Sequence, residues 1–315
     1  IIGAMGIFGG NSSIAFATLV TMVSYFAIGY VVGRVASLRV SAAWLSGAIA
    51  IAFTVVGALA VIEFVTRFNP FVLLHTSNGL YSVWGTIQIR GGVPRAEAAF
   101  GHSIALGCSL ALAIPFAIAA PFRLWLKVAM VSIMLAGCVV SFSRTAMLCA
   151  AIALVLSVVF DDAGSEATGS ADYRGNLLSL LGSMNPVGVA DSAQKDSSGT
   201  LHFAHFVSID SQLLLTGLTN GFLAMLLACV ALAGALWTVL RGRAVPGTIA
   251  IVAQIPALAT VALITQYSIL LFAVAGIAAS GQWISRQRRI DAERETSLST
   301  APTGRLHPIP LKEPS

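Results

Sequence analysis

The sequence predicts an all-α membrane protein, a polytopic bundle of transmembrane helices. Hydrophobic residues make up 57% of the 315 residues and charged residues only 10%, whereas soluble domains carry about 25% charged residues. Such a chain has too little polar surface to cover a water-soluble body. The sequence also contains several apolar runs, each long enough to cross a hydrocarbon core about 30 Å thick as a helix.

The candidate spans and the tail divide the chain into two parts. A transmembrane bundle covers 1–284, and 285–315 is predicted to be a disordered cytoplasmic tail because its Arg, Pro, Ser and Glu cannot form a core. Since residue 1 is Ile without a signal-peptide pattern, we expect the natural N-terminus to precede it. The spans are 13–33, 41–62, 102–120, 127–160, 212–240, 247–264 and 268–284.

Lysine and arginine in the short loops predict how the bundle is oriented. Such residues concentrate on the cytoplasmic side, so the outer side receives the loops 63–101 and 161–211. The net charge of +5 then reflects topology, and no nucleic-acid partner is predicted. The basic clusters are Arg34 and Arg39; Arg123 and Lys127; Arg241 and Arg243; and Arg286, Arg288 and Arg289.

The segment 127–160 does not fit this orientation simply, because it must cross an odd number of times. As one helix it would be about 50 Å long, too long for the hydrocarbon core, and it is too short for three crossings. Ser141–Thr145 is a polar stretch typical of a turn. Either one long, broken helix carries Arg144 within the membrane, or a crossing expected after Phe160 is absent from this sequence.

Arg144 is the first candidate functional residue. A charge at the centre of a membrane helix costs about 2.5–3.5 kcal/mol or more, which makes it a functional hypothesis. The alternative is an arginine at a helix end that reaches the headgroups. Ser141, Ser143 and Thr145 predict a polar pocket around it. A guanidinium binds phosphate bidentately, which suits a lipid-linked phosphate.

Further candidates lie in the two outer loops. Gly91, Gly92 and Pro94 predict irregular backbone that displays Arg90 and Arg95, unless this is an ordinary solvated loop. Arg174 lies in the second loop. A polyanionic ligand would suit these cations together with Arg144.

His202, His205 and Asp210 precede the span that starts at 212. Histidine and carboxylate are common general bases. Alternatively, Asp210 caps that helix. His202 and His205 lack a third metal ligand, so we expect no metal.

Cys108, Cys138, Cys149 and Cys229 lie in apolar runs and are expected to be buried thiols.

Missing motifs narrow the function classes. The sequence has no Walker loop, Rossmann fingerprint, G-x-S-x-G or H-E-x-x-H motif. No Asp or Glu lies in the middle of a span, where ion-coupled transporters usually need one. A pump driven by ATP within this chain is therefore disfavoured, and a transporter is less favoured.

Several short motifs together resemble the O-antigen ligase and polymerase superfamily. They are Arg95 followed by Phe100-Gly101-His102 and a span that ends in Pro115; SFSRTAML at Ser141–Leu148; Tyr173-Arg174 followed by Asn185-Pro186-Val187-Gly188; and Asp210-Ser211-Gln212-Leu213-Leu214 followed by Gly221. The resemblance covers residues 90 to 284.

This resemblance implies a membrane glycosyltransferase with a GT-C-like fold. The enzyme would transfer glycan from an undecaprenyl-pyrophosphate donor to a glycan or lipid acceptor, at the outer face of the bacterial inner membrane and without metal or cofactor. Arg144 and Arg174 would bind the pyrophosphate, with Arg95 assisting. Asp210 would take the catalytic position that is His in the ligases, with His205 as a nearby substitute, which favours a polymerase or exopolysaccharide-assembly enzyme.

Two other function classes remain open from the residues. One is a transporter or flippase for a polyanionic lipid or small molecule, which inverted repeats or paired broken helices would favour. The other is a non-catalytic subunit of a membrane assembly.

Overall fold

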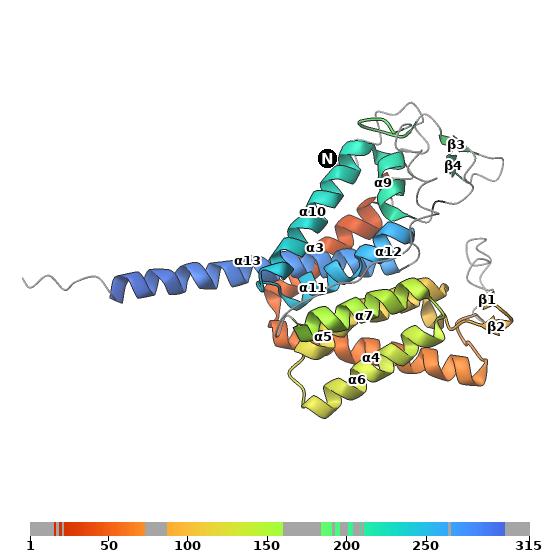
Figure 1. Cartoon of the computed structure of the whole chain (residues 1–315), viewed down its shortest axis with the longest axis horizontal. Coiled ribbons are helices and arrows are strands. Elements are labelled where there is room, and N and C mark those ends of the chain that lie inside the picture. The colour runs from red at the N-terminus through yellow and green to blue at the C-terminus, as the bar shows by residue number, and fades with distance from the viewer. Residues whose placement is uncertain are drawn as a thin grey trace, which may run out of the picture.

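A computed structural model of the chain describes residues 16, 19–20, 22–72, 87–159, 184–190, 193–195, 201–203, 209, 211–263 and 266–299. These residues are mostly helical, with two small antiparallel hairpins (Figure 1). The elements are η2 (Met22–Ala27), α3 (Ile28–Arg39), α4 (Ala42–Thr66), β1 (Ile89–Arg90), β2 (Val93–Pro94), η4 (Ala98–Phe100), α5 (Ser103–Ala119), α6 (Leu124–Val140), α7 (Arg144–Val159), β3 (Ala193–Lys195), β4 (Leu201–Phe203), α9 (Gln212–Asn220), α10 (Phe222–Leu240), α11 (Pro246–Ala253), α12 (Ile255–Thr260) and α13 (Tyr267–Ser299).

Helix α5 is the centre of the bundle. It contacts α4, α6, α7, α11 and α13, and its residues from Ser103 to Ala117 are buried apart from Ile104. A helix that is apolar all round is expected in such a position. Its many Ala, Ser, Gly and Cys residues let the neighbouring helices approach closely.

Glycines bring α3 into close contact with the first part of α13. A Cβ atom at Gly29 or Gly33 would collide with the backbone of α13, and one at Gly276 would collide with the carbonyl of Tyr30. The two backbones are therefore in direct contact, as in the small-residue interfaces that hold membrane helices together.

Among the described residues, three helices are long and apolar enough to cross a membrane: α4, α10 and the stretch Tyr267–Glu295 of α13. Helices α5, α6 and α7, and the pair α11–α12, are apolar but shorter. Large apolar side chains are exposed along α4 and α10, which suits contact with lipid. These features support the predicted all-α membrane protein.

Two helices occupy the described part of the predicted span 127–160. Helix α6 ends at Val140 and α7 begins at Arg144, so a single long helix is excluded. Figure 1 shows α7 returning from the turn beside α6. Phe142 adopts a left-handed conformation, with φ of 48°, and Ser143 Oγ accepts a hydrogen bond from Ala146 N at 3.2 Å. The polar residues thus end one helix and start the next.

Two other predicted spans are also interrupted. The span 212–240 consists of α9 and α10, which separate at Gly221, where φ is 98°. The span 247–264 consists of α11 and α12, which separate at Gln254. Pro256 lies in the first turn of α12, a position where proline starts a helix. Hydropathy continues across both breaks and does not reveal them.

The prediction of a disordered tail from residue 285 is wrong for its first part, because α13 continues to Ser299. The stretch 285–299 contains neither Gly nor Pro. Asp291 and Arg294 also have the i, i+3 spacing at which opposite charges support an isolated helix. Residues 300–315 lie outside the described residues.

Candidate functional site

The loop 87–102 lies against the turn between α6 and α7. Strands β1 and β2 pair within this loop, with Ile89 opposite Pro94 and Arg90 opposite Val93. Ala96 N donates a hydrogen bond to Val140 O at 3.1 Å. Two sequence motifs that lie more than forty residues apart, the loop with Arg95 and the turn with Ser141–Arg144, are therefore in direct contact.

Arg95 makes the main side-chain contact between the loop and the turn. Its Nε donates to Ser141 O at 2.9 Å, and its Nη1 donates to Gln88 Oε1 at 3.3 Å. Ser103 Oγ donates to the same Gln88 oxygen at 2.8 Å. Nη2 is buried, with no hydrogen-bond partner among the residues that the structure describes. Burial and the nearby Arg90 lower the pKa of Arg95, whereas Glu97 raises it.

The prediction that Arg90 and Arg95 are both displayed on irregular backbone is correct only for Arg90. Arg90 is exposed in strand β1, whereas only 8% of Arg95 is exposed. Arg95 is buried because its planar guanidinium donates to the backbone carbonyl of Ser141 and to the side-chain amide of Gln88 at the same time. Of its guanidinium, only Nη2 lacks a protein partner in the described part of the chain.

Glu63 holds the other side of the loop from the end of α4. Its Oε2 accepts hydrogen bonds from Ala98 N at 2.6 Å and Glu97 N at 3.2 Å. Its Oε1 accepts from Asn69 Nδ2 at 2.9 Å, and the same nitrogen donates to Ala98 O at 3.2 Å. The carboxylate is therefore buried but surrounded by donors. Glu63 belongs to none of the sequence motifs, so the sequence did not indicate this role.

Glu97 is a second buried carboxyl group, with no exposed surface. Its Oε1 accepts a hydrogen bond from Gln88 N at 2.9 Å, and its Oε2 is buried without a partner in the described segments. Burial raises the pKa of Glu97; the Gln88 bond lowers it, Glu63 raises it, and Arg95 lowers it. The raised pKa favours the neutral acid more than in water.

Arg144 is the first residue of α7, and its side chain is exposed. Ser141 and Ser143 do not form an open polar pocket beside it, because both are buried and hydrogen-bonded. Ser141 Oγ donates to Cys138 O at 2.7 Å. Gly107 of α5 makes room for Ser141 and Ala146. The serines thus fix the turn, and Arg144 remains the exposed charge on it.

His102 links the loop to α5. It is the N-cap residue of that helix, and its Nδ1 accepts a hydrogen bond from Ile104 N at 3.2 Å. Burial, followed by the charge of Arg95, lowers the pKa of His102 to about 4. The imidazole is therefore neutral at physiological pH, as its acceptor role requires.

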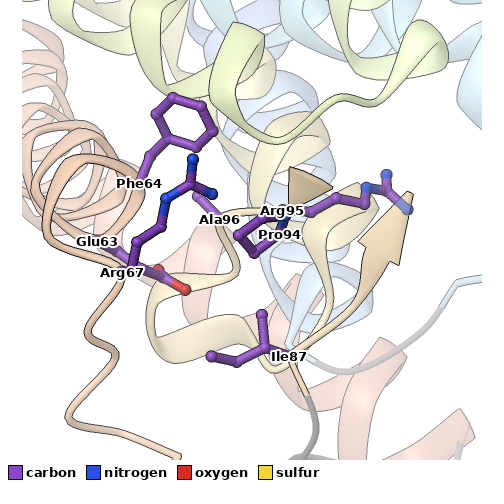
Figure 2. Close-up of a pocket in the computed structure, with 7 residues that line it drawn as sticks. All are labelled: Glu63, Phe64, Arg67, Ile87, Pro94, Arg95 and Ala96. Atoms are coloured by element: carbon purple, nitrogen blue, oxygen red, sulfur yellow. The ribbon is translucent and has the colours of Figure 1, made fainter. Parts of the chain in front are cut away.

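A small pocket of about 40 Å³ opens beside this loop, lined by Glu63, Phe64, Arg67, Ile87, Pro94, Arg95 and Ala96 (Figure 2). The guanidinium of Arg67 lies 4.8 Å from the centre of the Phe64 ring. Figure 2 shows the guanidinium of Arg95 pointing away from Arg67. A pocket of this size cannot hold a glycan. Arg67 belongs to none of the sequence motifs, so the sequence does not single it out.

A second pair of motifs meets between α9 and α10. Phe222 N donates to Asn185 O at 2.8 Å, and Leu223 N donates to Pro186 O at 3.2 Å. A Cβ atom at Gly221 would lie 2.6 Å from Val187 Cα. The motif Asn185–Gly188 therefore packs directly against Gly221.

The start of α9 is tied to the segment that follows α12. Gln212 N donates to Val261 O at 3.2 Å, and Gln212 Oε1 accepts from Leu263 N at 2.8 Å. The N-cap residue is Ser211, whose Oγ accepts from Leu214 N at 3.4 Å, which corrects the alternative that Asp210 caps this helix.

Three proposed site residues, Asp210, His205 and Arg174, lie outside the described residues, and so does the side chain of His202. Within the described ranges, no group of three or more His, Cys, Asp or Glu side chains could hold a metal ion.

Cys108, Cys138 and Cys149 are buried free thiols as expected, but Cys229 is exposed on α10. That helix turns most of its surface away from the bundle.

No protein-family model, curated protein or solved structure matches this chain. The resemblance to the O-antigen ligase and polymerase superfamily therefore remains a prediction from short motifs.

Proposed function

We propose that this protein transfers or polymerises glycan from an undecaprenyl-pyrophosphate donor at the outer face of the bacterial inner membrane. One observation carries the proposal. Motifs far apart in the sequence contact each other in pairs, the Arg95 loop with the SFSR turn and Asn185–Gly188 with Gly221. These contacts explain physically why the motifs of each pair would be found together in one sequence.

A multi-pass, GT-C-like bundle with the basic clusters in the cytoplasm is part of this proposal. Tryptophan prefers the membrane–water interface. Exposed tryptophans lie beside the basic clusters, and Arg241 stacks on one of them, with its Cζ 4.4 Å from the ring centre. These tryptophans are Trp44, Trp125, Trp237 and Trp283.

The proposed chemistry needs charge stabilisation more than a strong acid, because pyrophosphate is already a good leaving group. Arg144 is suited to bind it. Its charge is exposed, and it stands at the N-terminus of α7, where the helix dipole also favours an anion. Because α6 and α7 together return the chain to the side where α6 begins, the proposal also requires one more crossing between α7 and Arg174. Arg174 is then proposed to bind the same group, and the Nη2 of Arg95 is the part of that side chain left to assist. Asp210, or His205 in its place, would take the acceptor proton.

A flippase or transporter for a polyanionic lipid is the second candidate. Helices α11 and α12 are interrupted at Gln254, whose Nε2 is buried without a partner in the described part of the chain. Interrupted helices often line substrate sites in transporters. Tyr267 Oη, however, donates to Gln254 Oε1 at 2.8 Å, so part of this polar group already has a structural role.

Reconstitution into proteoliposomes with an undecaprenyl-pyrophosphate-linked glycan tests the proposal. The parent should elongate or transfer the glycan, and Arg144→Ala and Asp210→Ala should each reduce the rate strongly. Arg288→Ala, on the exposed end of α13, is the matched control and should behave as the parent. Equal rates in all variants would contradict the site. Movement of the lipid across the bilayer without glycan transfer would support the flippase.

A further inference from the structure

Ala98 has a backbone conformation that requires an explanation. Its φ is 45°, in the left-handed region, and it is an alanine rather than a glycine. An L-residue adopts this conformation only where its surroundings impose it, and such strain concentrates at functional sites.

The surroundings that impose it come from the end of α4. Glu63 Oε2 accepts from Ala98 N at 2.6 Å, while Asn69 Nδ2 donates both to Ala98 O at 3.2 Å and to Glu63 Oε1 at 2.9 Å. The N–H and C=O groups of residue 98 are thus both held. Glu97 N also donates to the Glu63 carboxylate.

The same short segment then reaches the turn that carries Arg144. Arg95 Nε donates to Ser141 O at 2.9 Å, and Ala96 N donates to Val140 O at 3.1 Å. Residues 95 and 96 make the contacts with the turn, and the next two residues, 97 and 98, make the contacts with Glu63. A change in the backbone at residue 98 therefore shifts the groups that hold the α6–α7 turn.

We infer that Glu63 is a positioning residue, which holds Ala98 in its strained conformation and thereby sets Arg95 against the turn that presents Arg144. The inference rests on the proposed function, because it assigns Arg144 to the donor. Glu63 itself does not meet the donor: it is 7% exposed, and both its oxygens accept hydrogen bonds from the protein. Three N–H donors surround the carboxylate, so an amide with one acceptor oxygen cannot replace it.

Glu63→Gln tests this role in the purified full-length chain in detergent, with farnesyl pyrophosphate as the probe for the donor headgroup. An amide N–H2 facing these donors should shift the loop, and a small misplacement lowers affinity for the probe by about tenfold or more. Glu295→Gln makes the same chemical change on the exposed part of α13 and should leave the affinity unchanged.

Ala98→Gly provides the decisive comparison. Glycine adopts positive φ without a steric cost, so the loop should no longer depend on Glu63 to hold it. The double variant Glu63→Gln, Ala98→Gly should therefore regain most of the lost affinity. If it binds the probe as weakly as Glu63→Gln alone, Glu63 acts in another way and the inference is overturned.

A thermal-unfolding cycle separates this inference from the proposed function. Should the parent fail to bind farnesyl pyrophosphate, donor binding would be contradicted, but the positioning role would remain measurable. Glu63→Gln and Arg95→Lys should then lower the melting temperature non-additively, because both weaken the attachment of the segment 95–98 to the α6–α7 turn. Ala98→Gly should restore part of the loss caused by Glu63→Gln. Additive losses without this restoration would overturn the inference.

Discussion

The Nε of Arg95 donates a hydrogen bond to the carbonyl oxygen of Ser141 at 2.9 Å, which joins the loop 87–102 to the turn between α6 and α7. A hydrogen bond from a charged donor contributes more than a neutral one, and breaking it leaves a buried carbonyl unsatisfied. Arg95 is thus a structural link before it is a ligand for any anion.

Arg95→Lys should destabilise the protein by about 2 kcal/mol, because an ammonium group cannot bond Ser141 and Gln88 with the geometry of a guanidinium fork. Thermal unfolding in detergent measures the change. Arg90→Lys, on the exposed strand β1, should shift the melting temperature little. Equal effects of the two substitutions would show that the buried contacts of Arg95 contribute nothing.

Gly221→Ala should disrupt the junction of α9 and α10. Its φ of 98° disfavours an L-residue, and the new Cβ would meet the backbone of Pro186 and Val187 at 2.6 to 2.9 Å. Gly242→Ala is the control, since φ there is 63° and nothing lies within 4 Å of a Cβ. We expect a cost of about 1 kcal/mol for Gly242→Ala and clearly more for Gly221→Ala. Chemical denaturation should show this order, and the reverse order would contradict the packing.

Acid should destabilise the loop through His102. Its pKa is about 4 in the folded chain, against 6.5 for an unperturbed histidine, so folding favours the neutral imidazole. The stability that this gives is complete above pH 6.5 and is lost as the pH falls from 6.5 toward 4, because the unfolded chain then binds the proton more readily.

His102→Asn should remove this pH dependence while keeping an N-cap acceptor for α5. The melting temperatures of parent and variant should converge as the pH is lowered from 7 to 4. Glu97 has a raised pKa and acts in the opposite sense, but it is common to both proteins. A constant difference between parent and variant over this range would argue against a neutral, buried His102.

Gly33→Ala should loosen the contact between α3 and α13, because its Cβ would collide with the backbone of Ala273. Gly234→Ala, within α10, adds a Cβ with nothing within 4 Å and should be neutral or slightly stabilising, since alanine is the better helix former. Limited proteolysis in detergent would report the difference. Equal resistance of the two variants would contradict close backbone packing at Gly33.

The sequence predicted the helical membrane class well, because composition and hydropathy depend on the solvent of the whole chain and not on particular contacts. It missed the interruptions at Gly221 and Gln254, since apolar side chains continue on both sides of each break. The sequence alone does not decide how 127–160 is divided. In the structure, Phe142 in a left-handed conformation ends one helix and Ser143 caps the next.

The candidate site was only partly predictable. Arg144 was singled out by its charge in an apolar segment, and it is exposed at the start of α7. The burial of Arg95 and the bonds to Glu63 were not foreseen, because their partners lie more than thirty residues away along the chain. Contacts of this kind leave no periodic pattern in a single sequence.

The glycine contact of α3 with α13 has a consequence for how the protein is made. Gly29 and Ile269 are roughly 240 residues apart, which a ribosome needs about ten to fifty seconds to translate. Throughout that interval α3 is already synthesised but lacks the helix against which it packs. We therefore expect α3 to depend on the insertion machinery or on temporary neighbours until α13 emerges, and chains truncated before α13 to be degraded rapidly in cells.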